Sequence, residues 1–158
     1  NKVGFATIVK DDPEPLLSEF KYSIDFTRPD FIPPKGTGGF YVAPLMNTPQ
    51  GVFHYIDFSN DEIHGYDVAC GNGSATEKLI YEFPKGMKIL AKPDNFSIDE
   101  NYIEYSASYE LEGNKLIVKR EIKDNTPANI CSANLINKQR QTLIKISDTL
   151  RSQVIYQY

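Results

Sequence analysis

The chain has 158 residues, of which 41% are hydrophobic and 24% charged, with a net charge of −4 and a pI near 5.2. This length supports one well-buried core or two small ones, and the composition is that of a globular protein. Lys and Arg never occur in runs of more than two residues, so the concentrated basic face that nucleic acid requires is absent. The apolar runs are too short for a transmembrane helix. We therefore expect a globular domain with no nucleic-acid partner and no membrane span.

The first third of the chain predicts two strands followed by a loop. Strands are expected at residues 3–9 and 19–27, and the second places Phe20, Tyr22, Ile24 and Phe26 on one face. Residues 28–39 then contain three prolines and three glycines. We expect residues 1–158 to form a single domain, with this stretch as the candidate internal boundary. A long surface crossover within that domain is the alternative.

The middle of the chain predicts a series of short strands separated by turns. The expected strands cover residues 40–45, 51–58, 63–69, 75–83 and 87–91. Turn residues rich in Pro, Gly, Asp and Asn follow at 84–86 and 92–95.

Residues 102–122 carry the clearest pattern. Apolar side chains alternate with polar ones on both sides of a Gly113-Asn114 turn. Because successive side chains of a strand point to opposite faces, this pattern predicts an antiparallel hairpin. One face is apolar and includes Arg120, whereas the other is mostly charged.

The period changes after the hairpin. From Ser132 a helical stripe is expected, with Ser132 or Asn134 as its cap, and the stripe consists of Leu135, Ile136, Gln139, Arg140, Leu143 and Ile146. A last strand is predicted at residues 153–156. Together the elements predict a mainly β protein: an antiparallel β-sandwich, Ig-like or related, with one C-terminal helix before the last strand.

The two cysteines, Cys70 and Cys131, allow two interpretations. Two buried free thiols are the simpler expectation. A disulfide is the alternative, and its ring of about 60 residues would stabilise the fold by roughly 4 kcal/mol. That alternative requires an oxidising compartment.

Catalytic chemistry has little support in the sequence. A thiol nucleophile needs a general base, and Cys70 has His54 and His64 nearby in sequence, with Asp57 and Asp67. However, a low-pKa thiol usually opens a helix, and the glycines around Asn72 do not continue one. A calcium loop that began at Asp57 would need Gly at its sixth position and Glu at its twelfth, but these positions hold Glu62 and Val68. The histidine spacing is not a zinc pattern. We expect no catalytic residue, no metal site and no cofactor.

Aromatic residues offer a candidate binding surface. Tyr41, Phe53, Tyr55 and Tyr66 could form a stacking platform for a glycan or a peptide. Packing in the core or pairing across strands is the alternative use of these rings.

The second half of the chain resembles the C-terminal β-domain of unknown function found in exported bacterial transglutaminase-like proteins. The resemblance rests on Phe83-Pro84-Lys85-Gly86-Met87-Lys88-Ile89, then Lys92-Pro93-Asp94-Asn95, and then the segment from Tyr105 to Arg120, with its Gly113 turn. It covers roughly the last 80 residues. The chain departs from the family pattern at residues 127–131, where Pro127 is not soon followed by a Tyr.

The resemblance implies a longer, exported parent protein. The catalytic Cys, His and Asp of such proteins would lie upstream of Asn1, and the parent would be periplasmic or at the cell surface. The expected role is a non-catalytic accessory domain whose partner is the transglutaminase-like core of the same protein. A freestanding glycan- or peptide-binding module is the alternative, and it would use Tyr41, Phe53, Tyr55 and Tyr66.

Overall fold

The computed structural model describes residues 5–10, 22–27, 35–45, 51–60 and 65–158. Contacts divide the chain into two compact units, Asn1–Gly36 and Thr37–Tyr158, and the division lies within the Pro/Gly-rich stretch 28–39. The first unit contains an antiparallel hairpin of β1 (Phe5–Lys10) and β2 (Tyr22–Thr27). Residues 3, 4 and 19–21 of the predicted strands, including Phe20, lie outside the described residues.

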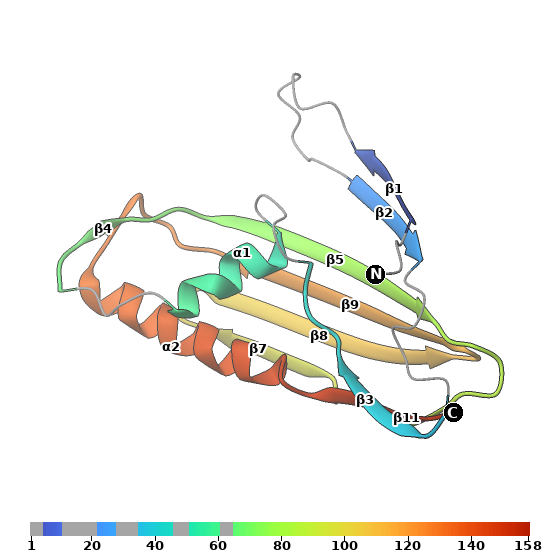
Figure 1. Cartoon of the computed structure of the whole chain (residues 1–158). Helices are drawn as coiled ribbons and strands as arrows, with labels where there is room; N and C mark the ends of the chain where they lie inside the picture. Colours follow the sequence, from blue (N-terminus) through green and yellow to red (C-terminus); the bar gives the residue numbers. More distant parts are fainter. Residues whose placement is uncertain (1–4, 11–21, 28–34, 46–50, 61–64) are drawn as a thin grey trace. The chain divides into compact units, whose positions relative to one another are not determined.

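A four-stranded antiparallel sheet organises the second unit (Figure 1). Its strands, in the order β5-β9-β8-β7, are β5 (Gly73–Glu82), β9 (Lys115–Asp124), β8 (Ile103–Glu112) and β7 (Phe96–Glu100). The long hairpin of β8 and β9 turns at Gly113, whose φ of 60° suits a glycine. The predicted hairpin is therefore confirmed.

The alternation of side chains produces one buried and one solvated face. Eight inward positions of β8 and β9 are buried, namely Ile103, Tyr105, Ala107, Tyr109, Leu116, Val118, Arg120 and Ile122. Leu111, at the end of the same face, is 44% exposed. The opposite face carries ion pairs such as Lys119–Glu110, both of whose side chains remain about half exposed.

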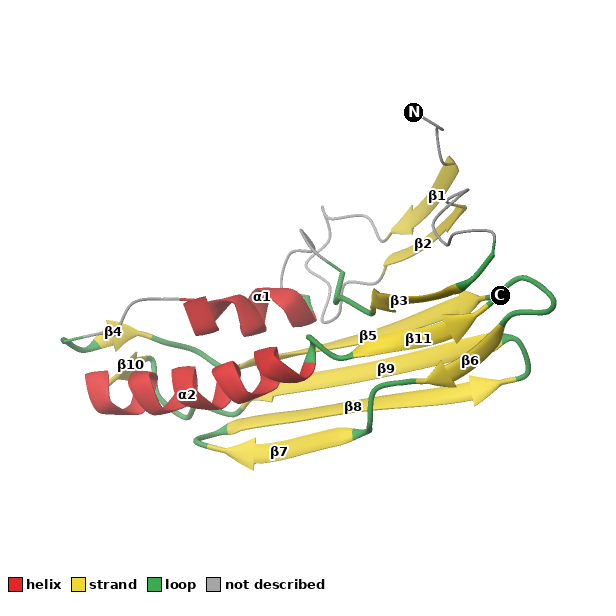
Figure 2. Cartoon of the chain, turned by 60° about the horizontal axis from the view of Figure 1, so that its bottom comes forward, coloured by secondary structure: helices red, strands yellow, loops and turns green. Residues whose placement is uncertain are grey.

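A second layer covers the buried face of this sheet (Figure 2). At one end it consists of two helices, α1 (Val52–Asp57) and α2 (Ala133–Thr149). At the other end it is a three-stranded antiparallel sheet in the order β3-β11-β6, formed by β3 (Thr37–Tyr41), β11 (Gln153–Gln157) and β6 (Lys88–Ala91). Phe40 of β3 joins the two layers, because its ring lies 5.7 Å from that of Tyr81 of β5.

Short elements complete this unit. A 3-10 turn, η1 (Phe58–Asn60), follows α1, and two-residue strands β4 (Val68–Ala69) and β10 (Ile130–Cys131) pair with each other. The protein is mainly β, with antiparallel sheets and a helix before the last strand, as the sequence predicts. No helix among the described residues is long and apolar enough to cross a membrane.

The prediction of a strand at residues 51–58 is wrong, because Val52–Asp57 form α1. Val52 and Ile56 are the buried residues of this helix, and their spacing of four is a helical period. The strand predicted at 63–69 reduces to Val68–Ala69 in the described residues, and positions 63 and 64 lie outside them. Strands β7 and β10 were not predicted.

Candidate functional site

A cavity of about 300 Å³ lies at the helical end of the second unit. Its apolar lining comes from Ile103 of β8 and from Ile136 and Leu143 of α2. Aromatic rings line it from α1 and η1, and they are those of His54, Tyr55 and Phe58. The rest of the wall consists of Ala69, Cys70, Gly71, Asn72, Asp124, Gln139 and Arg140. The cavity thus combines an apolar interior with a few polar groups, as ligand sites commonly do.

The sheet places an acidic side chain in this cavity. Gly73, Asp124 and Ile103 are register partners across β5, β9 and β8. Asp124 therefore continues the inward positions of β9 beyond Ile122, at the point where the helices begin to cover the sheet. An inward-facing carboxylate at a strand end is unusual, because ionised side chains are costly to bury.

One oxygen of Asp124 is held within the protein. Its Oδ1 accepts hydrogen bonds from the Thr126 backbone N–H, at 2.9 Å, and from the Thr126 hydroxyl. That hydroxyl accepts a bond from Gln139 Nε2 at 2.6 Å, which ties α2 to the end of β9. No described residue donates a hydrogen bond to Asp124 Oδ2.

Tyr55 brings a hydroxyl close to this carboxylate. A Cβ added at Gly73 would overlap Tyr55 Oη, so the phenol lies directly on the backbone of Gly73, the register partner of Asp124. Burial raises the pKa of Tyr55, and the negative charge of Asp124 raises that pKa further. Tyr55 Oη makes no hydrogen bond with any described residue.

A disulfide closes the cavity wall. Cys70 and Cys131 are bonded, with a Cα–Cα distance of 5.8 Å, and the expectation of two free thiols therefore does not hold. The pairing of β4 with β10 places the two residues side by side, and Cys70 N–H donates to Asn129 O at 3.0 Å. Neither sulfur is a free thiolate, so neither can act as a nucleophile in this state.

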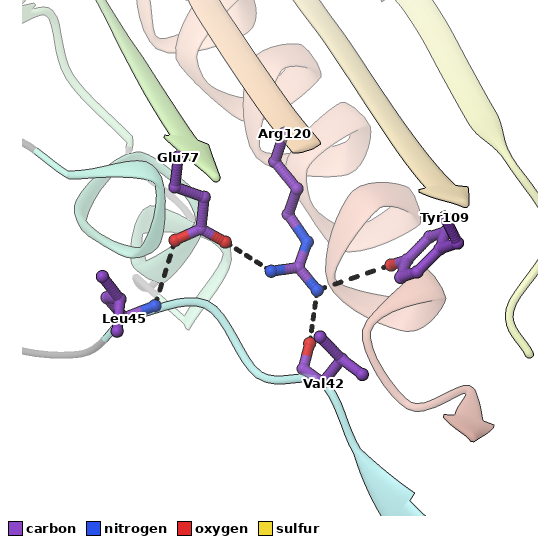
Figure 3. A network of polar contacts seen from close by, with 5 residues as sticks. All are labelled: Val42, Leu45, Glu77, Tyr109 and Arg120. Atoms are coloured by element: carbon purple, nitrogen blue, oxygen red, sulfur yellow. Dashed lines mark hydrogen bonds and ion pairs between the residues drawn. The ribbon is translucent and has the colours of Figure 1, made fainter. Parts of the chain in front are cut away.

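A buried ion pair lies further along the sheet (Figure 3). Arg120 of β9 contacts Glu77 of β5, and the two side chains are only 0% and 7% exposed. Arg120 also donates to Val42 O and, at 3.4 Å, to Tyr109 Oη, whereas Leu45 N–H donates to Glu77 Oε2 at 3.1 Å. Burial alone lowers the pKa of Arg120, but Tyr109 and Glu77 outweigh it and raise the pKa above its ordinary value. This network fastens the segment after β3 to the sheet.

The four aromatic residues predicted to bind a ligand are spread over β3, α1 and the segment before β4. Tyr41 is on β3 and 56% exposed, and Tyr66 precedes β4 and is 71% exposed. Phe53 and Tyr55 are two residues apart on α1 and so face different sides of the helix. Of the four, Tyr55 lines the cavity.

Of the two histidines considered for acid–base and metal chemistry, one lies at the cavity. His54 lines the cavity and lies between Tyr55 and Phe58, with ring centroids at 5.7 and 5.4 Å. His64 lies outside the described residues. No group of three metal-ligating side chains occurs within the described ranges.

Sequence reasoning missed Asp124 as a cavity residue, although a signal was available. The alternation that places Ile122 on the apolar face also places Asp124 there. Gln139 and Arg140 were assigned only to the helical stripe, and α1 was needed to show that this stripe borders a cavity.

Comparison with known proteins identifies a family and a fold. Residues 66–156 match the model of a domain of unknown function with a solved structure, DUF3858. No curated protein matches the sequence. The fold is similar to part of the crystal structure of a "putative protease" from Parabacteroides distasonis, with a TM-score of 0.59 and 11% sequence identity. The similarity covers 78% of this chain but only 24% of that one.

Proposed function

This chain belongs to the DUF3858 family of domains, and we propose that it is a non-catalytic accessory domain of a larger, exported bacterial protein. The proposed parent is transglutaminase-like, which means that it resembles a cysteine peptidase. In this proposal the catalytic Cys, His and Asp lie on another domain, and the present chain docks on that domain or presents substrate to it.

The observation that carries the proposal is the disulfide between Cys70 and Cys131. A cysteine peptidase needs a thiolate beside a general base, and His54 lines the same cavity as Cys70. Because the sulfur of Cys70 is bonded to Cys131, this pair lacks the nucleophile. The sulfur atom instead contributes to the stability of the wall that it closes.

The fold comparison supports an accessory role within a longer protein. The chain spans about a quarter of the length of the Parabacteroides protein, which is described as a putative protease. The resemblance of residues 83–89, 92–95 and 105–120 to the C-terminal β-domain of transglutaminase-like proteins points to the same kind of parent. Export is also consistent with the disulfide, because such bonds persist in oxidising compartments.

An activity assay tests this role. The 158-residue chain would be incubated with fluorogenic peptide and amide substrates, with and without a reductant, beside a Cys70→Ala/Cys131→Ala variant. We expect no hydrolysis or amide transfer above background in any sample. Activity that appears on reduction and is lost in the variant would show that Cys70 is a nucleophile and would overturn the proposal.

A further inference from the structure

We propose that the cavity between α1, α2 and the end of the sheet binds a lysine side chain of a partner peptide. In this site Asp124 Oδ2 is the counter-ion of the ammonium group, and Tyr55 Oη is a second hydrogen-bond acceptor. This inference goes beyond the accessory role, since it concerns what the domain binds and holds for any activity of the parent.

The ionised side chains on the inward face differ in how many partners they have. Arg120 and Glu77 form a buried ion pair, with further bonds to Val42, Tyr109 and Leu45. Asp124 is on the same face, and among the described residues only Thr126 donates hydrogen bonds to it, to one oxygen. A half-buried carboxylate oxygen that lines a cavity and lacks a partner in the described structure is an acceptor available to a cationic ligand.

Tyr55 provides a second hydrogen-bond acceptor near Asp124. Its hydroxyl lies against the backbone of Gly73, the register partner of Asp124. The carboxylate and the phenol therefore converge on one end of the cavity, and neither Asp124 Oδ2 nor Tyr55 Oη is used by a described residue. Two converging acceptors suit a group with several N–H donors.

The lining next to these two acceptors is apolar. Phe58, Ile136 and Leu143 present apolar surface next to these acceptors, and the ring of Phe58 is 47% exposed. A lysine side chain can lay its four methylenes along such a surface while its ammonium reaches a polar partner. A peptide amino terminus has polar amide groups next to its ammonium and cannot use this apolar lining equally well. Aromatic rings beside the cation add to the attraction.

Lysine fits better than arginine because of the hydrogen bonds of Asp124. A guanidinium group prefers to bind both oxygens of a carboxylate, and Thr126 already occupies Oδ1. An ammonium is a compact charge that needs one oxygen at a time. The net charge of −4 also favours a cationic partner.

Two other side chains line the cavity wall, and the charge of one of them affects the binding of a charged ligand. Arg140 lines the cavity from α2 and has interactions of its own, and His54 lines it from α1. The positive charge of Arg140 opposes a second cation in the same space. Its removal should therefore strengthen the binding of an ammonium group and weaken the binding of an anion.

Calorimetric titration of the 158-residue chain with Nα-acetyl-lysine N-methylamide, near neutral pH, tests the proposal. We expect saturable binding that Asp124→Asn weakens by at least roughly tenfold, the scale of a charge-assisted hydrogen bond. Tyr55→Phe, which removes no bond within the described structure, should weaken binding to a smaller but measurable extent. Arg140→Gln should tighten binding.

The matched controls separate this site from general charge attraction. Asp99→Asn removes an equal charge from an open depression on the outer face of the sheet, and it should leave binding unchanged. The Nε-acetylated probe, which carries no charge, should not bind. Thermal unfolding of each variant shows whether the weaker binding of Asp124→Asn comes from misfolding. The binding of Tyr55→Phe tests the same site independently of Asp124.

Three results would overturn the proposal. The first is the absence of saturable binding of the lysine probe to the wild-type chain. The second is equal weakening by Asp99→Asn and Asp124→Asn, which would mean nonspecific attraction. The third is equal or tighter binding of leucine N-methylamide, whose only charge is an α-ammonium, or of the corresponding arginine probe, because either would assign the cavity to another ligand.

Discussion

Arg120 shows how a charged residue can occupy a core position in this fold. It lies between Val118 and Ile122 on the inward face of β9 and is only 2% exposed. The burial is tolerated because Glu77, Val42 and Tyr109 supply partners. A buried pair of this kind gives little net stability, but the removal of one partner leaves an uncompensated charge.

We therefore predict that Arg120→Met lowers the free energy of unfolding by about 3–5 kcal/mol, because Glu77 is left buried without its cation. The matched control is Lys119→Met on the exposed face of the same strand, where the pair with Glu110 should contribute less than about 1 kcal/mol. Urea denaturation measures both values. Equal losses in the two variants would contradict this account of the network.

Tyr105 is a second buried polar residue of this region, and both its hydroxyl and Arg120 Nε lack a hydrogen-bond partner among the described residues. Its hydroxyl makes no hydrogen bond with any described residue, although the side chain is 3% exposed. Replacement by Phe removes an unsatisfied group at little cost in packing. We predict that Tyr105→Phe leaves stability at neutral pH unchanged or raises it by up to about 1 kcal/mol.

The same residue makes stability depend on alkaline pH. Burial raises the pKa of Tyr105, while the charge of Arg120 partly opposes the shift. The folded state therefore retains the phenolic proton to a higher pH than the unfolded state, whose tyrosines titrate near about 10. The contribution of protonated Tyr105 to the stability of the fold is therefore complete below about pH 10 and is lost as the pH rises above that value. Chemical denaturation at several alkaline pH values should show a steeper loss in wild type than in Tyr105→Phe, and parallel profiles would contradict the assignment.

At the scale of elements, the start of α2 depends on Ser132. Its side-chain oxygen accepts a hydrogen bond from Leu135 N–H at 3.3 Å, as the sequence predicts for a cap. We predict that Ser132→Ala lowers the free energy of unfolding by about 1 kcal/mol and that Ser132→Asp retains most of it, because Asp also caps helices well. Thermal unfolding of the two variants decides this, and equal losses would count against the cap.

The disulfide between Cys70 and Cys131 joins β4 to β10, each only two residues long. A pairing this short has little stability of its own, so the covalent bond should account for most of the order at this end. We predict that Cys70→Ser/Cys131→Ser lowers the free energy of unfolding by about 4 kcal/mol, given the 61-residue separation. A reductant should destabilise wild type similarly and leave the double variant unaffected. A wild-type melting temperature unchanged by reductant would contradict this prediction.

Local patterns and distant contacts differ in how well the sequence predicts them. The hairpin of β8 and β9 was predictable because its alternation and its Gly113 turn are adjacent in sequence. Helix α1 was not, since Val52–Asp57 is rich in aromatic and β-branched residues that favour strands. Its helical state depends on burial of Val52 and Ile56, which is a tertiary effect.

The candidate site also combines features that local sequence patterns predict with features that depend on distant contacts. Alternation places Arg120 and Asp124 on the inward face, but it cannot reveal that Glu77, 43 residues earlier, neutralises only the first of them. The cavity was not predictable, because it needs α1, α2 and the disulfide loop together. The placement of Tyr55 beside Asp124 depends on the packing of α1 against β5 and β9.

At the scale of the whole molecule, the second unit has one charged face and one covered face. The covered face supplies the core, the buried ion pair and the cavity, all between the four-stranded sheet and the layer above it. This organisation is in keeping with the proposed role in binding a partner. It places the proposed lysine site at the helical end, away from the hairpin turn at Gly113.

We propose that this chain assists catalysis carried out on another domain of its parent. The most direct measurement compares peptide hydrolysis by the 158-residue chain alone, by the proposed upstream core alone, and by the two mixed. We predict no activity for the chain, activity for the core, and a rate or KM that changes when the chain is added. Hydrolysis by the chain alone, abolished by a thiol alkylator under reducing conditions, would contradict the account.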